Sequence, residues 1–120
     1  MKQKRIVTIQ DLSCIGKCSL GVALPVISAL GVETAVLPTA VLSTHTGEFK
    51  NYSFCDLTDE IPKISKHWEQ EKFEFDAIYV GYLGSVWQMR LVEEFIDKFR
   101  GEDTVVFIDP VMADNGELYA

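Results

Sequence analysis

Two aspartates near the end of the chain have the residue type and spacing that suit a metal ion and phosphate groups. Asp109 follows an uncharged run of β-branched and aromatic residues, 104–108, and Asp114 comes five positions later in a turn rich in Asn and Gly. Carboxylate oxygens are hard ligands of the kind that Mg²⁺ prefers. Aspartate is also a common turn former, so a capping or turn role is the structural alternative for both residues.

Earlier segments carry side chains that could bind a small polar aromatic ligand. Asp11 follows a first apolar run, His45 and Thr46 lie in the hydroxyl-rich stretch 38–49, and Tyr82 follows a third apolar run. Carboxylate, imidazole, hydroxyl and aromatic groups in one crevice would fix the orientation of such a ligand. The structural alternatives are a histidine bonded to the backbone of a tight turn and a tyrosine packed in the core.

The apolar patterns predict the elements that position these side chains. Alternating strands and helices are expected, together with a strand-turn-strand flap formed by residues 38–49 and a returning arm at 52–54. The expected strands are 5–9, 34–37, 76–82 and 104–109, and the expected helices are 19–30, a second one beginning at 58–59, and 85–99. Ser85 is a good N-cap for the last helix, whose inward face is expected to hold Met89, Val92, Ile96 and Phe99.

This order predicts an α/β fold with a mostly parallel sheet, helices on both faces and a small β flap. The continuous apolar run at 104–108 predicts a strand buried on both faces. In an open α/β sheet, ligands bind at the carboxyl ends of the strands, where Asp11, His45, Tyr82 and Asp109 are all expected. Neither a Walker loop nor a Gly-x-Gly-x-x-Gly fingerprint occurs.

Composition narrows the class of protein. The 120 residues carry a formal net charge of −7, which argues against a nucleic-acid or anionic-membrane partner. Three cysteines with no signal peptide before them predict reduced thiols in a cytoplasmic protein. Because the chain ends soon after the loop that begins at Asp109, residues 1–120 are expected to be the N-terminal portion of one incomplete domain.

Three segments resemble the pyridoxal/pyridoxamine (vitamin B6) kinase family of the ribokinase-like superfamily. They are Ser43–Gly47, Gly81–Ser85 and Asp109–Tyr119, in this order and spacing, and Gln10 and Gly16 fit the same pattern. The resemblance covers essentially the whole chain. It implies a ribokinase-like fold and ATP-dependent, Mg²⁺-assisted phosphorylation of the 5′-hydroxymethyl group of pyridoxal, pyridoxine or pyridoxamine.

The resemblance also implies roles for single residues. His45 and Thr46 would border the vitamin ring, and Tyr82 would pack on it. Asp11 stands where many members of the family carry a serine that contacts the pyridine ring.

Two further residues match the family at the phosphate end of the site. Asp109 and Asp114 match an acidic pair near the ATP phosphates and the metal ion. Ala113 stands where glycine is usual in the family.

The family's catalytic aspartate and glycine-rich anion hole lie in its C-terminal half, so no catalytic base is expected within residues 1–120 and this chain alone is expected to be inactive. The full-length protein is expected to be a homodimer. Two alternatives stay open: a related kinase acting on hydroxymethylpyrimidine, and a non-catalytic half-domain that binds the ligand without phosphoryl transfer.

Overall fold

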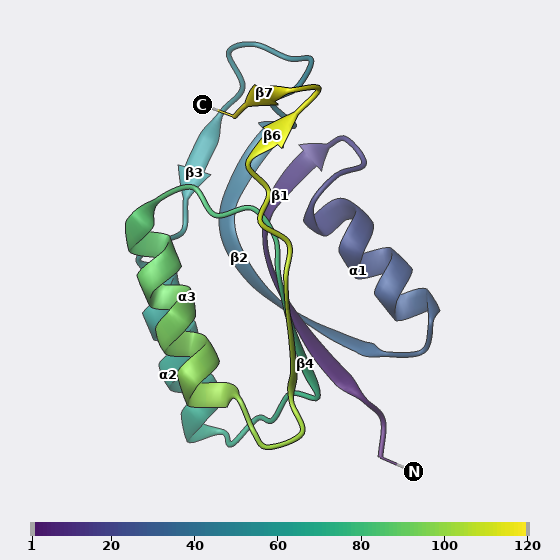
Figure 1. Ribbon diagram of the computed structural model, residues 1–120, viewed down its shortest axis with the longest axis vertical. Coiled ribbons are helices and arrows are strands. Elements are labelled where there is room, and N and C mark those ends of the chain that lie inside the picture. Colours follow the sequence, from purple (N-terminus) through teal and green to yellow (C-terminus); the bar gives the residue numbers. More distant parts are fainter. Residues whose placement is uncertain (1, 120) are drawn as a thin grey trace.

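A five-stranded sheet in the order β3-β2-β1-β4-β5 forms the centre of the computed structural model, which describes residues 2–119 (Figure 1). Strands β1, β2, β4 and β5 are parallel, and β3 is antiparallel to β2. The strands span Arg5–Ile15 (β1), Glu33–Thr44 (β2), Phe54–Asp56 (β3), Ala77–Val80 (β4) and Val105–Ile108 (β5). The predicted parallel sheet with an antiparallel flap strand is confirmed.

Helices cover both faces of the sheet, as predicted. Helix α1 (Leu20–Ala29) lies on one face, and α2 (Glu60–Gln70) and α3 (Val86–Phe99) lie side by side on the other (Figure 1). Alternate strand residues point to one face of a sheet, and here they meet the apolar stripes of α2 and α3. The resulting core contains Val7, Ile9, Leu37, Ile61, Phe75, Ile78, Val80, Leu91, Val92 and Phe95.

Helix α3 begins as predicted, and its predicted inward residues Val92, Ile96 and Phe99 lie in the core or pack against it. Ser85 is its N-cap, and the Ser85 hydroxyl oxygen accepts a hydrogen bond from the Gln88 backbone N–H. The predicted inward position of Met89 is wrong, because this side chain is 50% exposed. The buried positions are Gln88, Leu91, Val92 and Phe95. Gln88 can be the first buried residue of the helix because its side-chain amide is hydrogen-bonded inside the fold. A pattern of apolar residues does not predict such a position.

The first two parallel strands are longer than their apolar runs. β1 continues to Ile15 through the segment expected to be a turn, and β2 continues to Thr44 through the hydroxyl-rich stretch. The pairing register shifts between Gln10 and Leu12, where two steps along β1 match three along β2, so Asp11 lies opposite an extra residue in β2. Pairing with a neighbouring strand outweighs weak local strand propensity in both segments.

The predicted flap exists, with its returning arm two residues later than expected. Ala40 pairs with Asp56 and Leu42 with Phe54. We call residues 40–56 the flap.

β5 is an exposed strand in this chain, so the expectation that it is buried on both faces is wrong. Val105 is 62% exposed and Phe107 is 56% exposed, whereas Val106 packs on the core. β5 ends the strand order, and no segment of residues 2–119 pairs with its outer edge. The chain then forms a small hairpin, β6 (Ala113–Asp114) and β7 (Glu117–Leu118). Within residues 2–119, no helix is long and apolar enough to cross a membrane.

Candidate functional site

The segments with candidate side chains lie together at the carboxyl edge of the parallel strands. β1, β2, β4 and β5 run in the same direction, so the flap connection, residues 81–85 and residues 109–119 all follow strands at this edge, and Asp11 lies in the carboxyl-terminal half of β1. Figure 1 shows the flap connection and the β6–β7 hairpin at the same end of the molecule. This is the edge at which open α/β sheets bind ligands.

His45 is held by backbone groups on two sides. The His45 ring atom Nδ1 accepts a hydrogen bond from the Gly47 N–H at 3.3 Å. The His45 backbone N–H donates to the Ile15 carbonyl at 3.3 Å. A neutral imidazole in this arrangement carries its proton on Nε2, which is then a hydrogen-bond donor. The ring also meets Phe49 edge to face, with ring centroids 5.1 Å apart. The backbone-bonded role and a ligand-binding role are therefore compatible for this residue.

Gly16 provides the space for the His45 ring. A Cβ atom at Gly16 would lie 2.5 Å from His45 Cδ2, and the Gly16 φ of +121° is one that side-chain-bearing residues rarely adopt. The ring therefore lies against bare backbone. Thr46, which follows His45 in the flap, is exposed.

Tyr82 stands in the loop that follows β4, which we call the Tyr82 loop (residues 81–85). Its half-buried ring meets Tyr119 in a T-shaped contact, with centroids 6.3 Å apart. The preceding Gly81 lies against Gln10, because a Cβ there would approach the Gln10 side chain to 2.8 Å. The Gln10 side chain is buried, and its Nε2 donates to the Thr8 hydroxyl oxygen at 2.8 Å.

The three candidate carboxylates differ in their surroundings. Asp11 is half-buried in β1, whereas Asp109 and Asp114 are exposed. The Asp109 backbone is fixed because its N–H donates to the Val80 carbonyl at 2.9 Å and its carbonyl accepts from the Val111 N–H at 2.8 Å. Residues 2–119 contain no group of three or more His, Cys, Asp or Glu that could hold a metal ion by itself. The convergence of Asp109 and Asp114 on one metal ion stays a prediction.

Two residues near this edge were not predicted as part of the site. Tyr119 contacts Tyr82, and it lies inside the Asp109–Tyr119 segment that carried the resemblance. Gln88 is buried and bonded to both the Tyr82 loop and the base of the flap. The Ser85-x-x-Gln88 spacing of a capping box was the available sequence signal.

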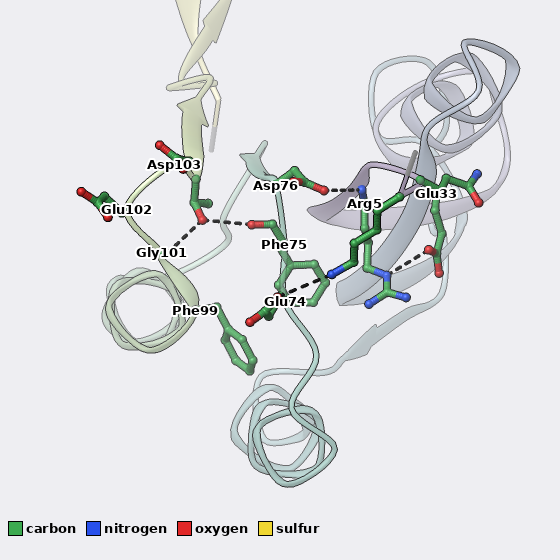
Figure 2. A pocket seen from close by; sticks show the side chains of 12 residues that line it. Arg5, Glu33, Glu74, Phe75, Asp76, Phe99, Gly101, Glu102 and Asp103 are labelled. Carbon is green, nitrogen blue, oxygen red and sulfur yellow. Dashed lines mark hydrogen bonds and ion pairs between the residues drawn. The ribbon is translucent and has the colours of Figure 1, made fainter.

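A cavity of about 490 Å³ lies at the opposite, amino edge of the sheet (Figure 2). Figure 2 shows Arg5 between two carboxylates: its Nε pairs with Glu33 at 3.1 Å, and its backbone N–H donates to Asp76 at 2.8 Å. This backbone bond, helped by Lys4, lowers the pKa of Asp76 below its ordinary value. At this edge Arg5, Glu33 and Asp76 bind one another and connect the starts of β1, β2 and β4, so they have a structural role.

Comparison with known proteins identifies the fold. No family model matches the chain. It is 49% identical, over 98% of its length and with a TM-score of 0.94, to a Bacteroides thetaiotaomicron protein provisionally assigned as a phosphomethylpyrimidine kinase and crystallised with pyridoxal. It is 32% identical to the pyridoxal kinase of Lactobacillus plantarum, over 98% of its length, with a TM-score of 0.86. This is the ribokinase-like fold of the pyridoxal kinases.

A curated relative agrees with the structures. Over 97% of its length, the chain is 25% identical to a provisionally assigned pyridoxal kinase of Schizosaccharomyces pombe. The resemblance to pyridoxal kinases and the α/β fold, both inferred from the sequence, are confirmed. The chain spans only part of these relatives, 38% of the Schizosaccharomyces pombe protein, 41% of the Bacteroides thetaiotaomicron protein and 42% of the Lactobacillus plantarum protein.

Proposed function

We propose that this chain is the vitamin-binding part of a kinase that transfers the γ-phosphoryl group of ATP to the 5′-hydroxymethyl group of pyridoxal, pyridoxine or pyridoxamine. The observation that carries the proposal is the 49% identity, over 98% of the chain, to a protein crystallised with pyridoxal. The grouping of the flap, the Tyr82 loop and residues 109–119 at one edge of the sheet supports it.

In this proposal the vitamin ring binds between the flap and the Tyr82 loop. Thr46 and the Nε2–H of His45 supply polar contacts to the ring substituents, and Tyr82 supplies an apolar face. Asp11, opposite the extra residue of β2, supplies a negative charge near the ring. These residues hold the acceptor hydroxyl in place, and the flap excludes water that would otherwise compete as the phosphoryl acceptor.

ATP and Mg²⁺ are the proposed co-substrate and metal ion. Mg²⁺ is usually held by one or two carboxylates together with substrate phosphates and water, and the exposed oxygen donors of Asp109 and Asp114 fit that set. When bound, the ion would neutralise charge on the transferring phosphoryl group. The related pyridoxal kinase of Leishmania donovani, 24% identical, is known in complex with ADP and pyridoxamine.

For the whole protein we propose, from the resemblance to pyridoxal kinases, a catalytic base outside residues 1–120 and a homodimeric assembly. We also propose a cytoplasmic location, from the three cysteines of the chain.

A second candidate function is phosphorylation of a hydroxymethylpyrimidine. The provisional assignment of the 49% identical relative as a phosphomethylpyrimidine kinase favours it. A third, from a different class, is a module that binds the vitamin without phosphoryl transfer.

One competition assay separates these functions. The protein that carries this chain is incubated with ATP and Mg²⁺ and with the three B6 vitamers and hydroxymethylpyrimidine together, and the phosphorylated products are identified by mass spectrometry. Preferential phosphorylation of a B6 vitamer is expected. Preferential phosphorylation of the pyrimidine would replace the proposal with the second function, and vitamin binding without product would replace it with the third.

A further inference from the structure

The side chain of Gln88 connects two segments that the proposed function places on either side of the vitamin ring. It is only 4% exposed, at the first turn of α3. Its Oε1 accepts a hydrogen bond from the Gly84 N–H of the Tyr82 loop at 2.8 Å. Its Nε2 donates to the Thr39 carbonyl of β2 and to the Thr58 hydroxyl oxygen, both at 3.0 Å. Both amide hydrogens and the amide oxygen are therefore used.

The orientation of this amide is set by groups of fixed polarity. The Gly84 N–H can only donate and the Thr39 carbonyl can only accept, so the oxygen of Gln88 must face the first and the nitrogen the second. A glutamate at this position would direct a carboxylate oxygen at the Thr39 carbonyl. A methionine would fill a similar volume without forming any of the three bonds.

The network continues from Gln88 into the base of the flap. The Thr58 hydroxyl donates to the Asp56 carboxylate, which also accepts from the Thr58 N–H at 2.8 Å. These bonds lower the pKa of Asp56 below its ordinary value. Asp56 pairs with Ala40 at the start of the flap, and the Thr39 carbonyl also accepts from the Leu57 N–H at 3.0 Å. One amide thus joins the Tyr82 loop, the middle of β2 and, through Thr58, the returning flap strand.

We propose that Gln88 is a positioning residue that sets the separation between the Tyr82 loop and the flap, and thereby the affinity of the site for its aromatic substrate. This inference rests on the proposed function, because the substrate is taken to bind between these two segments. Gln88 acts through Tyr82 and His45 and is not itself placed against the substrate. Buried hydrogen bonds fix such distances well because each broken bond leaves a polar group without a partner.

A first experiment tests the coupling without any substrate. Gln88→Met and a control, Leu91→Ala, are made in the protein that carries this chain. Leu91 lies on the same helix, is buried in the core and has no part in the network. The reporters are the hydrogen exchange of the Leu57 amide and the NMR shifts of the Tyr82 ring, neither of which bonds Gln88 directly. Gln88→Met is expected to change both reporters beyond any general loss of stability, and Leu91→Ala to change them only in proportion to stability. Equal behaviour of the two variants would overturn the proposal.

A second experiment tests the consequence for the substrate. Gln88→Met and Gln88→Glu are expected to raise KM for pyridoxal by about tenfold with a smaller change in kcat, because substrate binding and not the chemical step is affected. Protonation of a buried glutamate restores one donor, so the KM defect of Gln88→Glu relative to the parent protein should shrink as the pH falls. Gln88→Met should show no such trend.

The outcomes separate the inference from the function on which it rests. An unchanged KM in both Gln88 variants, measured in an active protein, would refute the positioning role. A parent protein that phosphorylates no B6 vitamer would refute the proposed function, and the two spectroscopic reporters would still decide whether Gln88 couples the segments.

Discussion

Replacing Gly16 with alanine tests how the flap is supported. Two separate effects are expected from this single methyl group. The first is backbone strain, because the φ of +121° is rarely adopted by residues with a side chain, and such conformations cost about 1 to 3 kcal/mol. The second is steric, because the new Cβ would lie 2.5 Å from His45 Cδ2. Ordinary contacts begin near 3.4 Å, so the ring must move by about 1 Å.

The steric effect can be sized from the contacts that His45 would lose. A shift of that size weakens the bond from the Gly47 N–H to Nδ1 and the edge-to-face contact with Phe49. A hydrogen bond contributes about 0.5 to 1.5 kcal/mol and an aromatic pair about the same. His45 is only half-buried, so we expect the lower end of the combined range, about 1 kcal/mol beyond the backbone strain.

Gly31→Ala is the matched control, because Gly31 also has a positive φ, +84°, but no atom within 4 Å of its would-be Cβ. Urea unfolding of both variants gives the excess destabilisation of Gly16→Ala. In a His45→Ala background that excess should vanish, because the ring that obstructs the new methyl group is gone. Gly16→Ala should also raise KM for pyridoxal, and Gly31→Ala should not. Equal destabilisation by the two glycine variants, with no dependence on His45, would refute the reasoning.

Three further outcomes are expected. Phe95→Ala should lower the free energy of unfolding by about 3 to 5 kcal/mol, because this core ring is 1% exposed. Phe54→Ala, at a 60% exposed position, should change it by less than about 0.5 kcal/mol. Equal effects of the two variants in urea unfolding would contradict the assigned core. The pKa of Asp76 is below its ordinary value of 3.8, so its contribution to stability is present above pH 3.8 and is lost as the pH falls through the lowered pKa. Asp76→Asn should remove that part of the acid-induced loss of stability. An unchanged decrease of the melting temperature at low pH in this variant would contradict the prediction. Asp109→Asn and Asp114→Asn should each raise the Mg²⁺ concentration needed for half-maximal activity. The melting temperature should stay within a few degrees of that of the parent protein, because both side chains are exposed. An unaltered Mg²⁺ titration would show that the two residues are not part of the metal site.

Much of the architecture could be predicted from local pattern. The alternation of apolar runs and amphipathic helices predicted the parallel sheet, the helices on both faces and the flap. The Ser85 cap was predictable because it depends on a side chain and a backbone group three residues apart. The grouping of Asp11, His45, Tyr82 and Asp109 at one edge follows from the direction of parallel strands alone.

Other features depend on partners that are distant in the sequence. The extension of β1 through the segment expected to be a turn, and the register shift opposite Asp11, arise from pairing with β2 about 30 residues later. The exposure of β5 depends on which strands are present to pair with it, and no local pattern contains that information.

The sequence by itself indicated the α/β fold and a small-ligand site at one sheet edge, because the residue types and their places after strands are local properties. Only the tertiary structure decided how the segments are held. The contact of His45 with Gly16 joins positions 29 residues apart, and the bond from Gln88 to Thr39 joins positions 49 apart. Such contacts exist only after the sheet has brought the segments together. A buried amide with all its partners and a glycine under an aromatic ring have no signature in an apolar pattern, and they give the candidate site its shape.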